Sequence, residues 1–195
     1  MKKIIILLIV VLFPSFNINA NDSFEIKRII VGNEKAKITI LAYESLTCSH
    51  CANFHINIYP LLKKDFIDTG IAKIEFRHFP LDVAAFNASK ISQCKNDGKS
   101  KILNSLFLNQ SKWIKGQSIE DVNENLKKFL ESESFDIDFK KCTTNKKIED
   151  FILNDRIEGA KKFKVNATPT IIINNKKFDK SLNYKNLKKT LEKLI

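Results

Sequence analysis

The sequence predicts an α/β fold in which one sheet carries a helical insertion. Strand patterns occur at residues 37–43, which alternate but are apolar on both faces, at 71–79, which alternate, and at 170–173, which form a short buried run. An amphipathic helical pattern separates the first two runs, and a long stretch of helical character separates the second from the third. Because the elements on either side of that stretch cannot each cover a sheet alone, we expect one domain over residues 21–195, with the insertion at about 82–164.

The first twenty residues have the pattern of a secretory signal peptide. Lys2 and Lys3 form a basic start, residues 4–13 form an unbroken apolar run, and Ala20 is the small residue that signal peptidase prefers. A membrane anchor would need about 20 apolar residues, but Pro14 ends the run early. We therefore expect export and cleavage after Ala20, which lowers the formal net charge from +11 to +9 by removing two lysines.

Composition excludes several classes of protein. A hydrophobic fraction of 44% supplies enough side chains for a core, which excludes wholesale disorder. Four cysteines in 195 residues are too few for a scaffold that replaces its core with disulfides. The lysine-rich stretches at 161–164 and 176–189 lack the interleaved aromatic residues of nucleic-acid grooves, so we expect solvated faces and no nucleic-acid partner.

The first half of the domain reads as strand, helix, strand. Residues 37–43 are apolar on both faces, as in a central strand. A helix is expected at 49–68, where the apolar residues recur at spacings of three and four, namely Phe54, Ile58, Leu61, Leu62 and Phe66. Pro60 should kink this helix without ending it. Residues 71–79 alternate as a second strand, and Pro80 closes it.

The second half contains the insertion and the return to the sheet. Helices are expected at 82–96, 99–114, 119–130 and 136–163. Trp113 should belong to the core of the insertion. After the strand at 170–173, Asn174 and Asn175 suit a tight turn that leads to an edge strand at 176–178. A terminal helix follows, marked by Leu187, Leu191 and Leu194.

Cys48, Ser49, His50 and Cys51 form a CxxC motif where the first strand gives way to the first helix. The unpaired N–H groups of a helix N-terminus stabilise a thiolate, so the pKa of Cys48 should fall below the ordinary value of about 8.5. His50 can add a hydrogen bond or a positive charge. A stabilised thiolate is a good leaving group, which makes the corresponding disulfide oxidising. Cys51, one turn further on, should be more buried and act as the resolving thiol.

A structural zinc site and a structural disulfide are the other interpretations of this motif. A structural zinc site needs four ligands, so His55 and a distant Cys or His would have to converge on the one CxxC pair. A purely structural disulfide within a CxxC is strained and leaves the helix terminus unused. We therefore expect a redox pair without metal or cofactor. His55 and His78 are weaker candidates, and we expect His55 to be a partly exposed packing residue.

A second signal lies at Thr168 and Pro169, immediately before the strand at 170–173. Proline cannot pair normally in a buried strand, and a cis peptide bond is one way to turn the chain into it. The signal is weak alone, but it becomes specific together with a CxxC motif at an upstream strand-to-helix junction.

These residues give the sequence a resemblance to a known family. The matching segments are YESLTCSHCANFH at 43–55, RHFPLD at 77–82, and Thr168-Pro169. With them, the chain resembles the DsbA family of exported thiol-disulfide oxidoreductases in the thioredoxin-fold superfamily. The resemblance covers nearly the whole mature chain and implies a thioredoxin-like fold, with the helical insertion between its βαβ and ββα halves.

The resemblance also implies roles for the site residues. Cys48 would be the exposed nucleophile, Cys51 the resolving thiol, and His50 a residue that tunes the first sulfur. Thr168 and Pro169 would face the disulfide and pair with the substrate backbone. The position of the family's buried acid holds Ala42 here, and we do not assign that role to the nearby Glu44.

The family implies an oxidase that introduces disulfides into newly secreted proteins. Reduced secreted proteins would be its substrates, a quinone-linked membrane protein its reoxidant, and the periplasm its location. Isomerases of the superfamily usually add an N-terminal dimerisation domain, for which residues 21–36 are too few, so we expect a monomer. The alternatives are an isomerase or reductase of the same fold, or a surface binding protein with secondary redox activity.

Cys94 and Cys142 remain. They fall in the first and last predicted helices of the insertion. Some family members carry a structural disulfide there, which we expect here without a catalytic role. Two separate buried thiols are the alternative.

Overall fold

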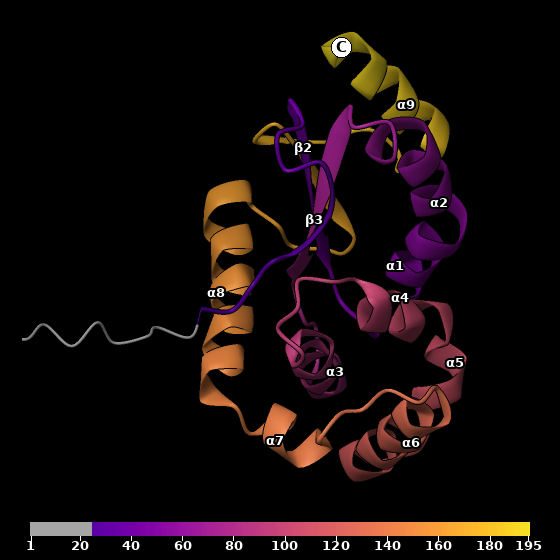
Figure 1. Ribbon diagram of the computed structural model, residues 1–195, viewed down its shortest axis with the longest axis vertical. Coiled ribbons are helices and arrows are strands. Elements are labelled where there is room, and N and C mark those ends of the chain that lie inside the picture. The colour runs from indigo at the N-terminus through magenta and orange to yellow at the C-terminus, as the bar shows by residue number, and fades with distance from the viewer. Residues whose placement is uncertain (1–24) are drawn as a thin grey trace, which may run out of the picture.

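The computed structural model describes residues 25–195, so the expected signal peptide and its cleavage site lie outside the described residues. Five strands form one sheet in the order β1-β3-β2-β4-β5. The strands are Ile29–Gly32 (β1), Ile38–Glu44 (β2), Ala72–His78 (β3), Thr170–Ile173 (β4) and Lys176–Lys177 (β5). Helices fill the interval between β3 and β4, which confirms the predicted α/β fold with a helical insertion (Figure 1).

The pairing of the strands brings the two sequence signals together. β2 is parallel to β3, with Glu44 opposite His78, and antiparallel to β4, with Tyr43 opposite Thr170. The end of β2, just before Cys48, therefore lies beside the start of β4.

β1 was not predicted. It pairs antiparallel with β3 at the edge of the sheet, with Ile29 opposite Phe76 and Gly32 opposite Lys73. It is four residues long, and only Ile29 is fully buried, so its sequence lacks the alternation that marks longer strands.

The predicted helix at 49–68 is one helical rod with two wide turns. It runs through α1 (Ser49–Asn53), the π-helical turn Phe54–Ile58, α2 (Tyr59–Leu62) and the π-helical turn Lys63–Ile67. The wide turn before Pro60 carries a hydrogen bond from the N–H of Tyr59 to the carbonyl of Phe54. Such widening accommodates a proline, whose ring clashes with the carbonyl one turn back. Leu61, expected on the apolar face, is instead exposed.

The insertion contains more helices than predicted. They are α3 (Val83–Gln93), α4 (Lys101–Leu108), α5 (Gln110–Trp113), α6 (Ile119–Ser132) and α7 (Phe139–Thr143), followed by α8 (Lys146–Phe163). The single helix expected at 136–163 is wrong, because Asn145 interrupts it and caps α8 by accepting from the N–H of Ile148 at 3.2 Å. The helix expected at 99–114 likewise divides at Asn109.

Helices cover both faces of the sheet (Figure 1). α8 packs on one face, where Gly159 lies directly against the ring of Tyr43. α1, α2 and α9 (Tyr184–Leu191) cover the other face, and the core on that side continues into the insertion. There Trp113 is buried as predicted, and its Nε1 donates to the carbonyl of Leu106 at 2.9 Å.

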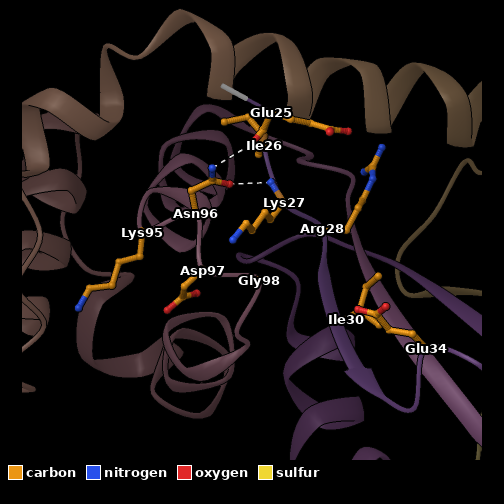
Figure 2. Close-up of a pocket in the computed structure, with 10 residues that line it drawn as sticks. All are labelled: Glu25, Ile26, Lys27, Arg28, Ile30, Glu34, Lys95, Asn96, Asp97 and Gly98. Carbon is orange, nitrogen blue, oxygen red and sulfur yellow. Dashed lines mark hydrogen bonds between the residues drawn. The ribbon is translucent and has the colours of Figure 1, made fainter. Parts of the chain in front are cut away.

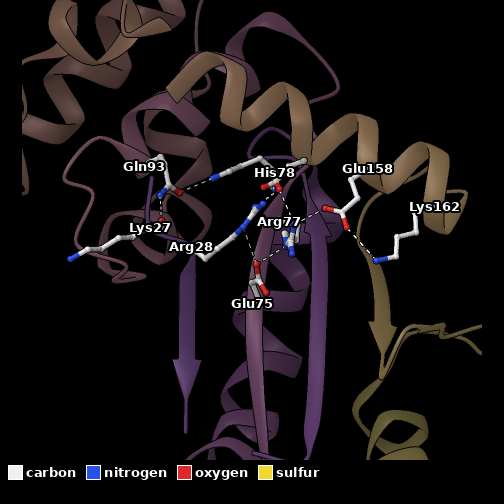
Figure 3. A network of polar contacts seen from close by, with 9 residues as sticks. Lys27, Arg28, Glu75, Arg77, His78, Gln93, Glu158 and Lys162 are labelled. Atoms are coloured by element: carbon white, nitrogen blue, oxygen red, sulfur yellow. Dashed lines mark hydrogen bonds and ion pairs between the residues drawn. The ribbon is translucent and has the colours of Figure 1, made fainter. Parts of the chain in front are cut away.

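A polar network ties α8 to the end of β3 (Figure 3). The fully buried carboxylate of Asp155 accepts hydrogen bonds from Arg28, from Arg77 Nη1 at 3.0 Å and from the backbone N–H of His78 at 3.1 Å. Arg77 also pairs with Glu158 at 3.0 Å. Because buried carboxylates are costly unless paired, this arrangement fixes the place where the chain leaves β3 for the insertion.

Candidate functional site

Cys48 occupies the N-cap position of α1, where the sequence places it. Its backbone is extended, and its carbonyl accepts from the N–H groups of Cys51 and Ala52, both at 3.1 Å. The side chain is half-buried, and both Cys48 and Cys51 are free thiols in the structure. The site is therefore described in its reduced form.

The environment of Cys48 favours the thiolate. A hydrogen bond from the Cys51 thiol is the largest influence lowering the pKa of Cys48 to about 5, against the opposing effect of burial. The backbone N–H groups of Cys51 and His50 lower this pKa further. These N–H groups belong to the first turn of α1, so the predicted helix terminus accounts for part of the lowering of the Cys48 pKa. The thiol of Cys51 accounts for a larger part.

The loop of Thr168 and Pro169 faces this sulfur. The peptide bond between the two residues is cis, as predicted. Sγ of Cys48 lies 3.3 Å from the carbonyl oxygen of Thr168, to which the protonated thiol donates. The Thr168 hydroxyl is buried and makes no hydrogen bond within residues 25–195, so the main-chain carbonyl is the contact that geometry establishes.

Cys51 differs sharply from its neighbour. It is fully buried, and burial is the main cause that raises the pKa of its thiol. The hydrogen bond to Cys48 and the charge of Glu44 raise this pKa further. The pair thus combines one sulfur that is readily ionised and accessible with one that is neither, which suits a nucleophile and a resolving thiol.

Glu44 and His55 form a buried pair that sequence reasoning missed. The expectation of a partly exposed His55 is wrong, since its side chain is 1% exposed and its Nε2 lies 2.9 and 3.1 Å from the carboxylate oxygens of Glu44. The His55 ring also stacks on Phe107 of α4, with centroids 4.1 Å apart. Burial raises the pKa of Glu44, against the lowering influence of His55. A signal was available, because His55 lies one helical turn after the buried Cys51.

His50 and His78 stand apart from this pair. The ring of His50 is exposed and makes no hydrogen bond to Cys48 in the described chain, so its established contribution is its backbone N–H. That ring borders a cavity of about 240 Å³ whose other walls are Asn53, Ile58, Thr168, Pro169 and Leu182. His78 is buried and contacts Gln93 at 3.2 Å, and burial lowers its pKa.

The zinc interpretation finds no support in the geometry. Within residues 25–195, no three side chains of His, Cys, Asp or Glu are grouped as a metal site requires. His55, which that interpretation needed as a ligand, is engaged by Glu44.

Cys94 and Cys142 are joined by a disulfide with a Cα–Cα distance of 5.5 Å. The bond links the end of α3 to α7, which resolves the alternative between a bridge and two separate thiols. Nearby, the largely buried Lys90 donates to the carbonyl of Thr143 at 2.6 Å and crosses between the same two helices.

A larger cavity of about 1270 Å³ lies elsewhere, between the segment before β1 and the loop after α3 (Figure 2). Its walls carry charges of both signs and include neither cysteine of the CxxC motif. Asn96 spans one side by accepting from the N–H of Lys27 at 2.6 Å and donating to the carbonyl of Glu25 at 2.9 Å. These contacts fasten the start of the described chain to the insertion.

Comparison with known proteins decides the family. A family model described as thioredoxin matches residues 25–193. The chain belongs to the thioredoxin family. Its structure is similar to the crystal structure of alpha-DsbA1 from Wolbachia pipientis, at 30% identity and a TM-score of 0.76, covering 86% of this chain and 90% of that one. This places it in the DsbA branch, as the sequence motifs predict.

Relatives by sequence agree with this placement. The chain is 27% identical over 164 residues to a protein of Rickettsia conorii named a protein-disulfide oxidoreductase, covering 82% of this chain and 56% of that protein. It is 25% identical over 174 residues to Disulfide bond formation protein D of Bacillus subtilis, covering 84% and 75%. The chain therefore spans little more than half the length of the rickettsial relative.

Among residues 25–195, none of the helices combines the length and apolar character needed to span a bilayer.

Proposed function

We propose that this DsbA-family protein is an exported thiol-disulfide oxidase that transfers the Cys48–Cys51 disulfide to secreted proteins. The observation that carries the proposal is the asymmetry of the pair: Cys48 is accessible, with a pKa lowered to about 5, whereas Cys51 is buried. A stabilised thiolate leaves readily, so the disulfide of such a pair is reduced easily and oxidises other thiols.

The exchange would proceed in two steps. A substrate thiolate attacks Sγ of Cys48, the bond to Cys51 breaks, and Cys51 leaves with the electron pair and takes up a proton. A second substrate thiolate then attacks the substrate sulfur of the mixed disulfide, and Cys48 leaves as the thiolate. The substrate loses two electrons and gains a disulfide, while the enzyme pair becomes reduced.

The proton for Cys51 has a candidate source. Because burial raises the pKa of Glu44, this carboxyl group retains a proton at higher pH than an exposed glutamate does. Its charge acts on Cys51, so proton transfer between them would avoid leaving two anions in the same buried space. His55 holds the carboxyl group in place from the other side.

Substrate recognition would use the surface around Cys48. An extended peptide beside the Thr168–Pro169 loop could pair with its backbone, in the manner of strand addition. The cavity of about 240 Å³ beside His50 would then receive a substrate side chain. Export to the periplasm and reoxidation by a quinone-linked membrane protein are part of the same proposal.

A single comparison tests this function against its alternatives. The oxidised protein is incubated with a reduced test protein, the reduced protein is incubated separately with a scrambled one, and native disulfides are counted in both. An oxidase forms disulfides in the reduced protein faster than it rearranges the scrambled one. Faster rearrangement would indicate an isomerase, and failure in both assays would leave a binding protein. Cys48→Ser is the matched control, since it removes the attacked sulfur and leaves the fold's core unchanged.

A further inference from the structure

The loop that carries Cys48 is held in place by the helical insertion. Gln110, the first residue of α5, donates its side-chain Nε2 to the carbonyl of Leu46 at 2.7 Å and to that of Cys48 at 3.0 Å. One amide group therefore spans the two carbonyls on either side of Thr47. The contact is long-range, since 62 residues separate Gln110 from Cys48.

A second contact holds the same loop from another helix. The hydroxyl of Thr47 donates to Asp82 at 2.6 Å, and Asp82 also caps α3 by accepting from the N–H of Ala85 at 2.7 Å. α4 contacts α1, and α5 directly follows α4 in the chain (Figure 1). The turn before α1 is thus fixed by side chains from the start of α3 and the start of α5.

We infer that Gln110 is a positioning residue for Cys48, whose amide fixes the first turn of α1 in the orientation that stabilises the thiolate. The carbonyl of Cys48 also accepts the first helical hydrogen bonds of α1, from Cys51 and Ala52. Gln110 therefore donates a hydrogen bond to the carbonyl of Cys48, and the orientation of this peptide group directs the helix N–H groups toward Sγ. This inference rests on the proposed redox function.

The two redox states need this contact to different degrees. In the oxidised form the covalent Cys48–Cys51 bond itself restrains the turn. In the reduced form no such bond exists, and hydrogen bonds alone hold the N–H groups toward the thiolate. Loss of the Gln110 amide should therefore destabilise the reduced form more than the oxidised form, making the disulfide less oxidising.

The test is the equilibrium of the Cys48–Cys51 pair with glutathione in purified full-length protein. Gln110→Met keeps the length of the side chain but removes both donors. The matched control is Asn125→Leu, which removes an amide that holds the carbonyl of Lys115 at 3.0 Å, elsewhere in the insertion. One net hydrogen bond corresponds to about a fivefold change in an equilibrium constant. Only the part of this effect that differs between the reduced and oxidised forms changes the equilibrium with glutathione, so we expect a shift of about two- to fivefold.

The expected result is a shift toward the oxidised pair in Gln110→Met and none in Asn125→Leu, even where thermal melting shows similar losses of stability. An unchanged equilibrium in folded Gln110→Met, or an equal shift in both variants, would overturn the inference alone. Should Gln110→Met fold poorly, Gln110→Asn tests the same point with a shortened amide, and an unshifted equilibrium there overturns the inference as well. A wild-type pair that does not exchange with glutathione would overturn the proposed function too.

Discussion

Replacing both Cys94 and Cys142 with alanine should lower the free energy of unfolding by about 4 kcal/mol. The magnitude follows from the 48 residues that separate the two cysteines, because a cross-link removes loop-closure entropy from the unfolded chain. For a domain of this size, such a loss corresponds to a fall of about 10 °C in melting temperature. Lys90 still connects α3 to the carbonyl of Thr143, so the native contact between the helices should persist.

Urea unfolding of wild type and of the Cys94/Cys142 variant measures this difference. Cys48 and Cys51 are kept reduced in both proteins, and the Cys94–Cys142 disulfide is kept intact in wild type. Cys48→Ala/Cys51→Ala is the matched control, since it also removes two cysteines but leaves the long loop closed. Oxidation of a test protein by the Cys94/Cys142 variant should stay within about twofold of wild type, because the loop contacts of the site come from the starts of α3 and α5. A loss below about 1 kcal/mol, or an equal loss in the control, would refute the loop-closure reasoning.

Three further predictions concern single positions. Cys51→Ala should accumulate mixed disulfides visible on a non-reducing gel, whereas Cys48→Ala should form none; equal trapping by both would contradict the assigned roles. Glu44→Gln should slow reduction of the oxidised pair by a small thiol about tenfold at neutral pH, because it removes a proton donor, and an unchanged rate would exclude that role. Gly159→Ala places a Cβ 2.7 Å from the Tyr43 ring, so it should cost about 1–3 kcal/mol in urea unfolding; a neutral result would mean that the ring moves freely.

The sheet was largely predictable because β2 is apolar on both faces and β3 alternates apolar and charged residues. Residues 38–44 and 72–78 stand out from the polar sequence around them, whereas Ile29–Gly32 is too short to show a period. The division near Asn145 was missed because the helical pattern continues on both sides of it. Its capping hydrogen bond to Ile148 depends on local backbone geometry that periodicity does not report.

The site was predictable where its chemistry is local. A CxxC motif at a strand-to-helix junction and a proline before a buried strand both carry their meaning in a few adjacent residues. The partners that come from other elements were not, because their side chains meet only after folding: Glu44 reaches His55 across the β2–α1 junction, and Gln110 arrives from the insertion. The place of His55 one helical turn after Cys51 indicates its burial but not its partner, and Gln110, a polar residue within a helical stretch, gives no sign of its contact.

The lowered pKa of Cys48 has a definite consequence for stability. The thiolate stabilises the reduced folded protein fully above the unfolded-state pKa of about 8.5, and this stabilisation declines as the pH falls toward about 5. The oxidised protein lacks the titrating thiol. Between these pH values, acidification should therefore lower the free energy of unfolding of the reduced form relative to that of the oxidised form.

The most direct measurement is the ultraviolet absorbance of the thiolate in the reduced protein as a function of pH. We expect a single transition with a midpoint at about pH 5, absent from Cys48→Ala, while the buried Cys51 stays protonated through neutral pH. A midpoint near 8.5, the value of an ordinary thiol, would contradict the claim that the start of α1 and its neighbours hold this sulfur as an anion.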